Sequence, residues 1–150
     1  MKQARAAIKT LKTTLKKALL DALGQGPEAA IEVCSAKAQR LARAASNERV
    51  TVGRTSARLR NPKNAPRGWV KPILADYQRS PGVPPYRTVL LDKGGVGYVE
   101  PIYTARICLT CHGSDPSPSV AQRIRARYPE DRATGFRAGE IRGLFWAEVR

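Results

Sequence analysis

Residues 87–103 read RTVLLDKGGVGYVEPIY and predict the architecture of the whole chain. The segments 87–91 and 96–103 are rich in the β-branched and aromatic residues that favour strands. The sequence DKGG at 92–95 joins them, and a short glycine-containing connection is typical of an antiparallel hairpin. The segment GEIRGLFWAEV at 139–149 predicts a turn and a further strand. We therefore expect a small antiparallel sheet.

Helices are predicted before this hairpin. Residues 1–20 hold no acidic residue, and their large apolar residues recur at helical spacing between lysines, which predicts a basic amphipathic helix within residues 1–25. Its apolar face is expected to pack on the domain. Residues 27–45 follow the break GQGP and predict a second long helix. Helices followed by a small sheet indicate an α+β fold, with residues 1–150 forming one domain.

The rest of the chain is less regular. Residues 46–86 are rich in proline and predict short helices and many turns. Residues 118–128 predict a short helix that opens at Ser117-Pro118 and closes before Pro129.

The sequence CLTCH at residues 108–112 is the C-x-x-C-H signature of covalent haem attachment. Two thiols at this spacing reach the two vinyl groups along one edge of a haem, so Cys108 and Cys111 are the predicted thioether sites. The next residue, His112, then lies under the iron as the proximal ligand, and it is the single histidine of the chain. The predicted cofactor is one covalently attached haem c.

Two other uses of these cysteines are less specific. A thioredoxin-like dithiol lies between a strand and a long helix, but Gly113 and Pro116 prevent a long helix from starting directly after the motif. A zinc site needs four ligands, which the motif residues together with Cys34 would supply.

Charge and cofactor together predict partners and location. The chain holds 27 Lys and Arg against 12 Asp and Glu, a formal net charge of +15. Such a charge favours an acidic protein partner, or peripheral contact of the basic N-terminus with a membrane surface. Haem c is attached outside the bacterial cytoplasm, so we expect a periplasmic protein whose leader or anchor is absent from this sequence. This location, and basic residues spread along the chain, argue against nucleic-acid binding.

The motif does not set the second axial ligand of the iron. A second histidine is absent and the single methionine is Met1, which leaves Cys34, a lysine, a tyrosine or no protein ligand. Cys34 lies on the apolar stripe of the predicted helix at 27–45, among small residues that leave room for a bulky group. A thiolate ligand would stabilise ferric iron, and its release on reduction would open a site for a small gas such as CO or NO.

Four segments resemble, in order, a family of single-haem c-type domains from cyanobacteria and proteobacteria. They are AIEVCSAKAQ (30–39), VGRTSARLRNPKNAP (52–66), RICLTCHG (106–113) and YPEDRATGFRAGEIRGLFWAEV (128–149). The resemblance implies a PAS-like fold, in which a small antiparallel sheet and helices enclose one haem. It also implies axial ligation by histidine and cysteine, which falls on His112 and Cys34 here. The family is thought to sense redox state or small gases, or to transfer electrons.

The block RTSARLR supplies three arginines that are candidates for binding the haem propionates, Arg54, Arg58 and Arg60. Arginine binds carboxylates bidentately, so we expect at least one of them to hold a propionate and at least one to be solvated. Arg137 and Arg142, near the last predicted turn, are weaker candidates.

These expectations combine into one leading function and one alternative. The leading function is a periplasmic c-type haem protein that senses redox state or a small gas, because a change in Cys34 ligation would shift its helix toward a signalling partner. The alternative is a soluble electron-transfer cytochrome that docks to an acidic redox protein, with an on-rate that salt lowers. An enzyme, for example one acting on a sulfur compound, is not expected, because the sequence offers no acid/base pair or second histidine.

Overall fold

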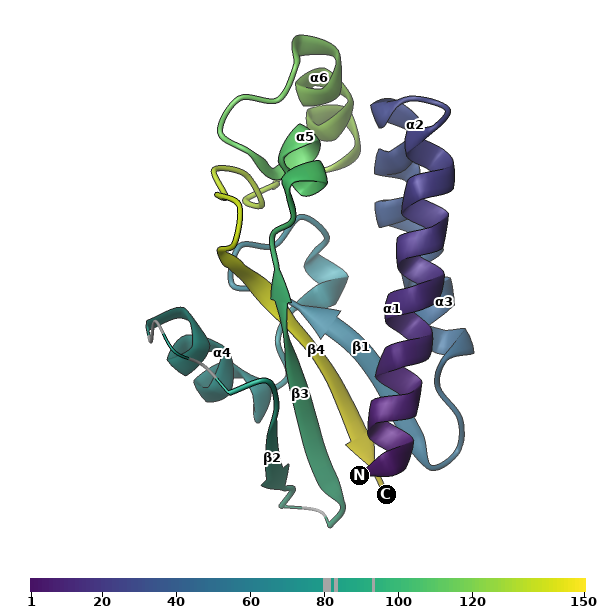
Figure 1. Ribbon diagram of the computed structural model, residues 1–150, viewed down its shortest axis with the longest axis vertical. Coiled ribbons are helices and arrows are strands. Elements are labelled where there is room, and N and C mark those ends of the chain that lie inside the picture. Colours follow the sequence, from purple (N-terminus) through teal and green to yellow (C-terminus); the bar gives the residue numbers. More distant parts are fainter. Residues whose placement is uncertain (80–81, 83, 93) are drawn as a thin grey trace.

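The structure is a computed structural model that describes residues 1–79, 82, 84–92 and 94–150, and it contains a four-stranded antiparallel sheet (Figure 1). The strands are β1 (Val50–Thr55), β2 (Arg87–Leu90), β3 (Val96–Tyr103) and β4 (Ile141–Val149). They lie in the order β1-β4-β3-β2, and each neighbouring pair is antiparallel. The predicted hairpin and the α+β class are thereby confirmed. Lys93, in the predicted turn, lies outside the described residues.

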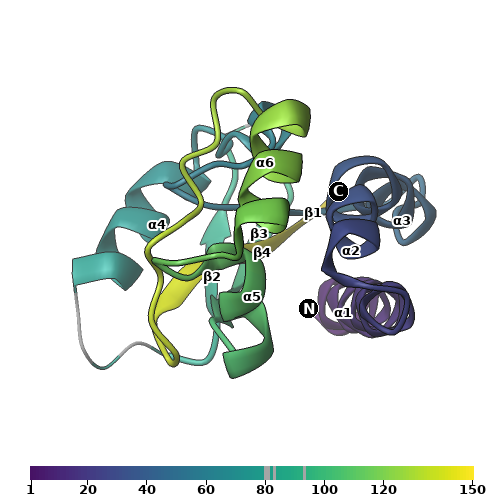
Figure 2. The same cartoon turned by 90° about the horizontal axis from the view of Figure 1, so that it is seen from above.

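Helices cover both faces and one end of this sheet (Figures 1 and 2). They are α1 (Lys2–Leu23), α2 (Pro27–Glu32), α3 (Ala38–Ala44), α4 (Val70–Arg79), α5 (Leu109–His112) and α6 (Pro118–Arg127). The helix predicted at 27–45 exists, but a π-helical turn at Val33–Lys37 separates α2 from α3. None of the described helices is long and apolar enough to cross a membrane.

Strand β4 shows how the apolar run LFWA builds two cores. Successive strand residues point to opposite faces of a sheet. Leu144 and Trp146 therefore pack against α4 on one face, while Phe145 and Ala147 pack against α1 and α3 on the other. The run lacks polar alternation because helices cover both faces of this central strand.

Helix α1 lies along the sheet with its apolar stripe inward. Its buried residues are Ala4, Ile8, Leu11, Leu15, Ala18 and Ala22. Most of its lysines are exposed, while Lys12 forms an ion pair with Glu100 of β3.

The prediction for residues 46–86 missed strand β1, whereas the ten-residue helix α4 is one of the short helices that it expected. Gly53 in the middle of β1 weakens the strand pattern, yet the fold requires it there. A Cβ atom at Gly53 would lie 2.4 Å from Cζ2 of the Trp146 indole, so only glycine lets this side chain cross the strand. In α4, Pro72 occupies the first turn, where the amide hydrogen that proline lacks has no helical partner.

Residues 106–140, here called the motif lobe, lie beyond the end of the sheet and carry α5 and α6 (Figure 1). At the base of the lobe Thr104 and Glu140 are joined by a backbone hydrogen bond of 2.8 Å. The lobe contacts α2 through a small apolar cluster that is separate from the two cores of the sheet. This cluster contains Ile31, Val120, Ile124 and Tyr128, with Cys111 packed against it.

Candidate functional site

A cavity of about 340 Å³ lies between α1, the π-helical turn and the motif lobe. This volume falls within the range of about 300–1,000 Å³ that is common for ligand pockets. Its walls include leucines of α1 and four predicted site residues, Cys34, Cys108, Cys111 and His112. A smaller cavity adjoins it and shares part of this lining. The structure therefore brings together residues that are up to 78 positions apart in the sequence.

His112 is buried, and each of its ring nitrogens has one contact. Nδ1 lies 2.7 Å from the carbonyl oxygen of Ala133, which can only accept, so Nδ1 carries the proton and donates it. Nε2 is then an acceptor, and Arg142 Nη1 donates to it at 2.9 Å. Burial, together with the nearby positive charge of Arg142, lowers the pKa of His112 well below its usual range. A neutral imidazole with Nε2 as the acceptor is the form that binds a metal, once Arg142 gives up this contact.

The two motif cysteines lie on one short helical stretch. Cys108 ends a 3₁₀ turn and Cys111 lies in α5, so their spacing of three residues places them on one helical face. Both thiols are free and half-buried, and burial raises the pKa of Cys111. Both also line the larger cavity beside His112, as the attachment motif requires.

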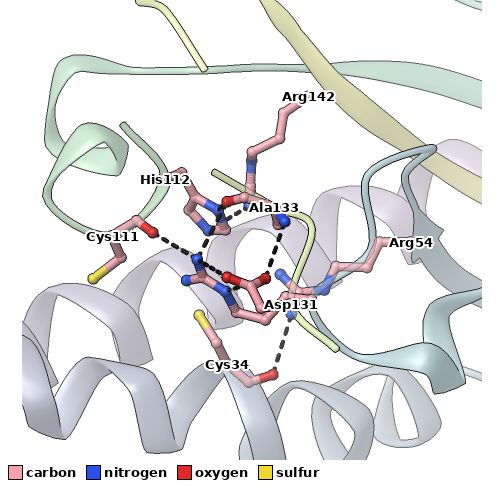
Figure 3. Close-up of polar contacts among 8 residues, drawn as sticks. Cys34, Arg54, Cys111, His112, Asp131, Ala133 and Arg142 are labelled. Carbon is pink, nitrogen blue, oxygen red and sulfur yellow. Dashed lines mark hydrogen bonds and ion pairs between the residues drawn. The ribbon is translucent and has the colours of Figure 1, made fainter. Parts of the chain in front are cut away.

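Cys34 lies within the π-helical turn, where the amide of Ala38 donates to the carbonyl of Val33, five residues earlier. Such turns are rare in proteins. Those that occur are often found at functional sites, because the extra residue redirects the side chains around it. Cys34 is a free, half-buried cysteine, and its carbonyl oxygen accepts a 3.4 Å hydrogen bond from Arg54 Nη2. In Figure 3, Cys34 and His112 lie on opposite sides of the polar cluster.

Of the three arginines predicted to bind propionates, Arg60 is the most completely paired within the protein. It is 9% exposed and forms a two-pronged ion pair with Asp131, with distances of 3.0 and 3.1 Å. Its Nη2 also donates to the carbonyl oxygens of Cys111 (2.6 Å) and Ala133 (3.2 Å). Arg60 thus ties the RTSARLR block to both sides of the motif lobe.

The other two arginines of the block differ from each other. Arg58 forms an ion pair with Glu140, donates to the carbonyl oxygen of Thr134 at 3.0 Å and lies 3.5 Å from the ring centre of Phe136. Arg54 lines both cavities, and none of the ion pairs of the described residues includes it. The propionate assignments stay predictions, with Arg54 the most available of the three.

Arg142, a weaker propionate candidate from the sequence, contacts His112 and lines both cavities. In the register of β3 and β4, Ile102 pairs with Gly143 and Tyr103 pairs with Ile141, so Arg142 is the extra residue of a β-bulge. The bulge is compact, because a Cβ atom at Gly143 would lie 2.0 Å from the carbonyl oxygen of Thr55.

Among the described residues, no carboxylate forms an ion pair with the guanidinium of Arg142. Its Nε is buried and has no hydrogen-bond partner in the described part of the chain. Burial, and the positive charge of Arg54 nearby, lower the pKa of Arg142. Within the described ranges, moreover, no three His, Cys, Asp or Glu side chains gather closely enough to hold a metal ion between them.

The sequence of the chain was compared with models of known protein families. A family model described as Tll0287-like matches residues 1–149. The chain belongs to the Tll0287-like family. The resemblance noted in the sequence is thereby confirmed.

A solved structure shares the fold of this Tll0287-like chain. It is the crystal structure of the cyanobacterial heme-protein Tll0287, with a TM-score of 0.65 and 24% sequence identity over 95% of this chain and 91% of that chain. The match confirms the PAS-like architecture. Comparison with curated proteins finds no match.

Proposed function

We propose that this protein binds one haem c through Cys108 and Cys111, with His112 and Cys34 as axial ligands, and acts as a periplasmic sensor of redox state or of a small gas. The observation that carries the proposal is that neutral His112, with Nε2 as an acceptor, lines one cavity together with both motif thiols and Cys34. When bound, haem supplies a one-electron redox centre and a coordination position for a small ligand.

The residues present fit this cofactor. Each thiol adds across one vinyl group, so that a C–S bond forms and the thiol proton goes to the other vinyl carbon, without an oxidant. The leucines of α1 supply an apolar wall for a porphyrin ring. The buried Arg142 Nε without a hydrogen-bond partner indicates a missing acceptor in the cavity, and the propionates would provide one.

The π-helical turn gives Cys34 a way to signal. Thiolate binding favours the ferric state, so reduction weakens the hold on Cys34. The turn is present with Cys34 free, so a change in Cys34 ligation would act by displacing this turn between α2 and α3. Because α2 packs on the motif lobe, such a displacement would carry the change beyond the cavity.

The first test is maturation of the chain by haem c attachment machinery in a bacterial periplasm. We expect one covalent haem per chain by mass and by the spectrum of its pyridine complex. Cys108→Ser and Cys111→Ser should each leave one thioether, and the double variant should lose the covalent haem. Cys34→Ser is the control, because it should keep both thioethers. A chain that is produced with this machinery and carries no haem would contradict the proposal.

A second candidate function, electron transfer with an acidic partner, is favoured by the charge around the cavity. Its lining holds five cationic residues and no acidic residue. These residues are Lys12, Lys16, Arg54, Arg60 and Arg142. Three apolar lining residues are also exposed to solvent by about half, namely Leu20, Tyr103 and Ile107, at 44%, 53% and 46%. An apolar centre beside positive charge is suited to an acidic redox protein.

Small redox reagents of opposite charge test this candidate. Oxidation of the reduced protein by ferricyanide should be fast and slowed by salt, while oxidation by tris(phenanthroline)cobalt(III) should show the opposite salt dependence. Lys16→Glu should slow the ferricyanide reaction by a factor of about five, as expected for a change of two charges about 10 Å from a trivalent reagent in salt. Lys71→Glu on α4 is the matched control for net charge, because Lys71 is exposed and does not line the cavity.

The outcomes separate a carrier from a sensor. A carrier keeps both axial ligands in both redox states, so its reduced form should not bind CO readily. Equal effects of Lys16→Glu and Lys71→Glu would mean that only net charge matters, which would contradict a docking surface at the cavity.

A further inference from the structure

Two arginine side chains line the cavity, and none of the ion pairs formed by the described residues includes either of them. Arg54 and Arg142 both line the two adjoining cavities, and neither lining contains an aspartate or a glutamate. Removing a positive charge from water is costly unless an anion accompanies it. Arg142, whose Nε is buried, and the half-buried Arg54 beside it therefore favour an anionic ligand at this end of the cavity.

We infer that Arg142 and Arg54 bind the two haem propionates, an inference that rests on the proposed function. Two carboxylates would balance the two positive charges. Carboxylates are also the groups that a guanidinium binds with two parallel hydrogen bonds. Propionate binding thus falls to Arg142 and, within the RTSARLR block, to Arg54 alone.

The other arginines around the cavity are excluded from this role because their anions are already in place. Arg58 is paired with Glu140, and Arg60 is paired with Asp131. Arg60 also donates to two carbonyl oxygens, so its guanidinium has little capacity left. The four arginines thus form two groups. Arg58 and Arg60 are paired with carboxylates of the protein, whereas Arg54 and Arg142 are free to bind the carboxylates of a ligand.

The β-bulge provides a second, independent reason to assign Arg142. A bulge interrupts the hydrogen-bond ladder and redirects the extra residue, and bulges are frequent beside functional sites for this reason. Here the extra residue is Arg142 itself. Its Nη1 contacts His112 Nε2, which is the nitrogen that the iron takes under the proposed function. Arg142 must therefore release His112 when the haem binds, and a propionate replaces this contact.

The test is the pH dependence of the reduction potential of the matured haem protein. In the wild-type protein both propionates are held ionised by arginine, so the potential should be flat between about pH 5 and pH 8. In Arg142→Gln, the propionate that lost its cation has a raised pKa and takes up a proton within this window. The potential should then fall as pH rises, because the ionised carboxylate stabilises the ferric state. Arg54→Gln should behave in the same way.

Two controls isolate the position and the charge. Arg58→Gln removes an arginine of the same cavity whose anion is Glu140, and it should leave the potential flat. Arg142→Lys keeps the charge and should also stay flat. If Arg142→Gln does not mature, Arg54→Gln decides, since the inference requires a pH-dependent potential in that variant.

Three results would overturn the inference. A flat potential in both Arg142→Gln and Arg54→Gln would show that the propionates lie elsewhere. A pH-dependent potential in Arg58→Gln alone would return the role to that arginine. A flat potential with a shifted CO stretching frequency in Arg142→Gln would place Arg142 beside a ligand on the iron. In each case an intact haem spectrum in the wild-type protein leaves the proposed function standing, whereas a wild-type protein without haem refutes that function itself.

Discussion

Replacing Cys34 with alanine is expected to abolish the low-spin rhombic electron paramagnetic resonance signal of the ferric protein and to raise its reduction potential. An anionic sulfur ligand stabilises ferric iron, so its loss favours the ferrous state. Axial ligands tune haem potentials over about 0.8 V, and a rise on the order of 100 mV or more is expected here. Spectroscopy of the matured protein and a potentiometric titration measure the two effects.

The control for this substitution is Val33→Ala, which disturbs the same π-helical turn but leaves the sulfur in place. It should retain the thiolate signal. A low-spin thiolate signal that persists in Cys34→Ala would remove Cys34 from the iron, and a high-spin signal in the wild-type protein would show an iron open on that side. Reduced Cys34→Ala should bind CO without the delay that ligand release imposes on the wild-type protein.

Replacing Asp131 with alanine should cause the largest loss of stability. Asp131 and Arg60 are both buried, with 8% and 7% of their side chains exposed, and Asp131 also accepts from the amide of Ala133. The substitution leaves the guanidinium of Arg60 buried without its anion, which costs about 3–5 kcal/mol. A urea titration of the matured protein, followed by circular dichroism, measures the change in the free energy of unfolding.

Two further variants show whether the cost comes from the unpaired charge. Asp76→Ala breaks ion pairs of an exposed carboxylate with Arg79 and Arg87 and should cost much less stability than Asp131→Ala, because water and salt screen exposed pairs. The double variant Arg60→Met/Asp131→Leu removes both buried charges and should be more stable than Asp131→Ala alone. An Asp131→Ala protein no less stable than Asp76→Ala would mean that the pair contributes little to the fold.

The sequence predicted the regular parts of this molecule well, because their signals are local. The hairpin of β2 and β3 follows from alternating strand formers around a glycine turn, and α1 follows from apolar residues at helical spacing. The haem attachment predicted from Cys108–His112 also rests on five neighbouring residues, and it stays a prediction. Each of these predictions needs only near neighbours in the chain.

The irregular parts could not be predicted, because they depend on partners distant in the sequence. The bulge that holds Arg142 exists only in the pairing of β4 with β3. Strand β1 was missed because Gly53 weakens its pattern, and the reason for this glycine is the indole of Trp146, 93 positions later. The same limit applies to the arginines. Their number is evident in the sequence, but the anions that distinguish Arg60 from Arg54 are visible only in the fold.

The separate apolar cluster of the motif lobe has a consequence for how the chain receives its cofactor. Hydrogen exchange and proteolysis show that proteins open in cooperative units, and units with few buried contacts open at the lowest free energy. The lobe is held to α2 by a small cluster outside both cores of the sheet and to the RTSARLR block by the contacts of Arg58 and Arg60, so it would open by breaking these contacts while the sheet stays folded. An attachment enzyme must reach Cys108 and Cys111, and such partial opening would expose them without global unfolding. Once both thioethers have formed, the porphyrin would fasten the lobe to the rest of the domain, and its amides should then exchange at rates closer to those of the sheet.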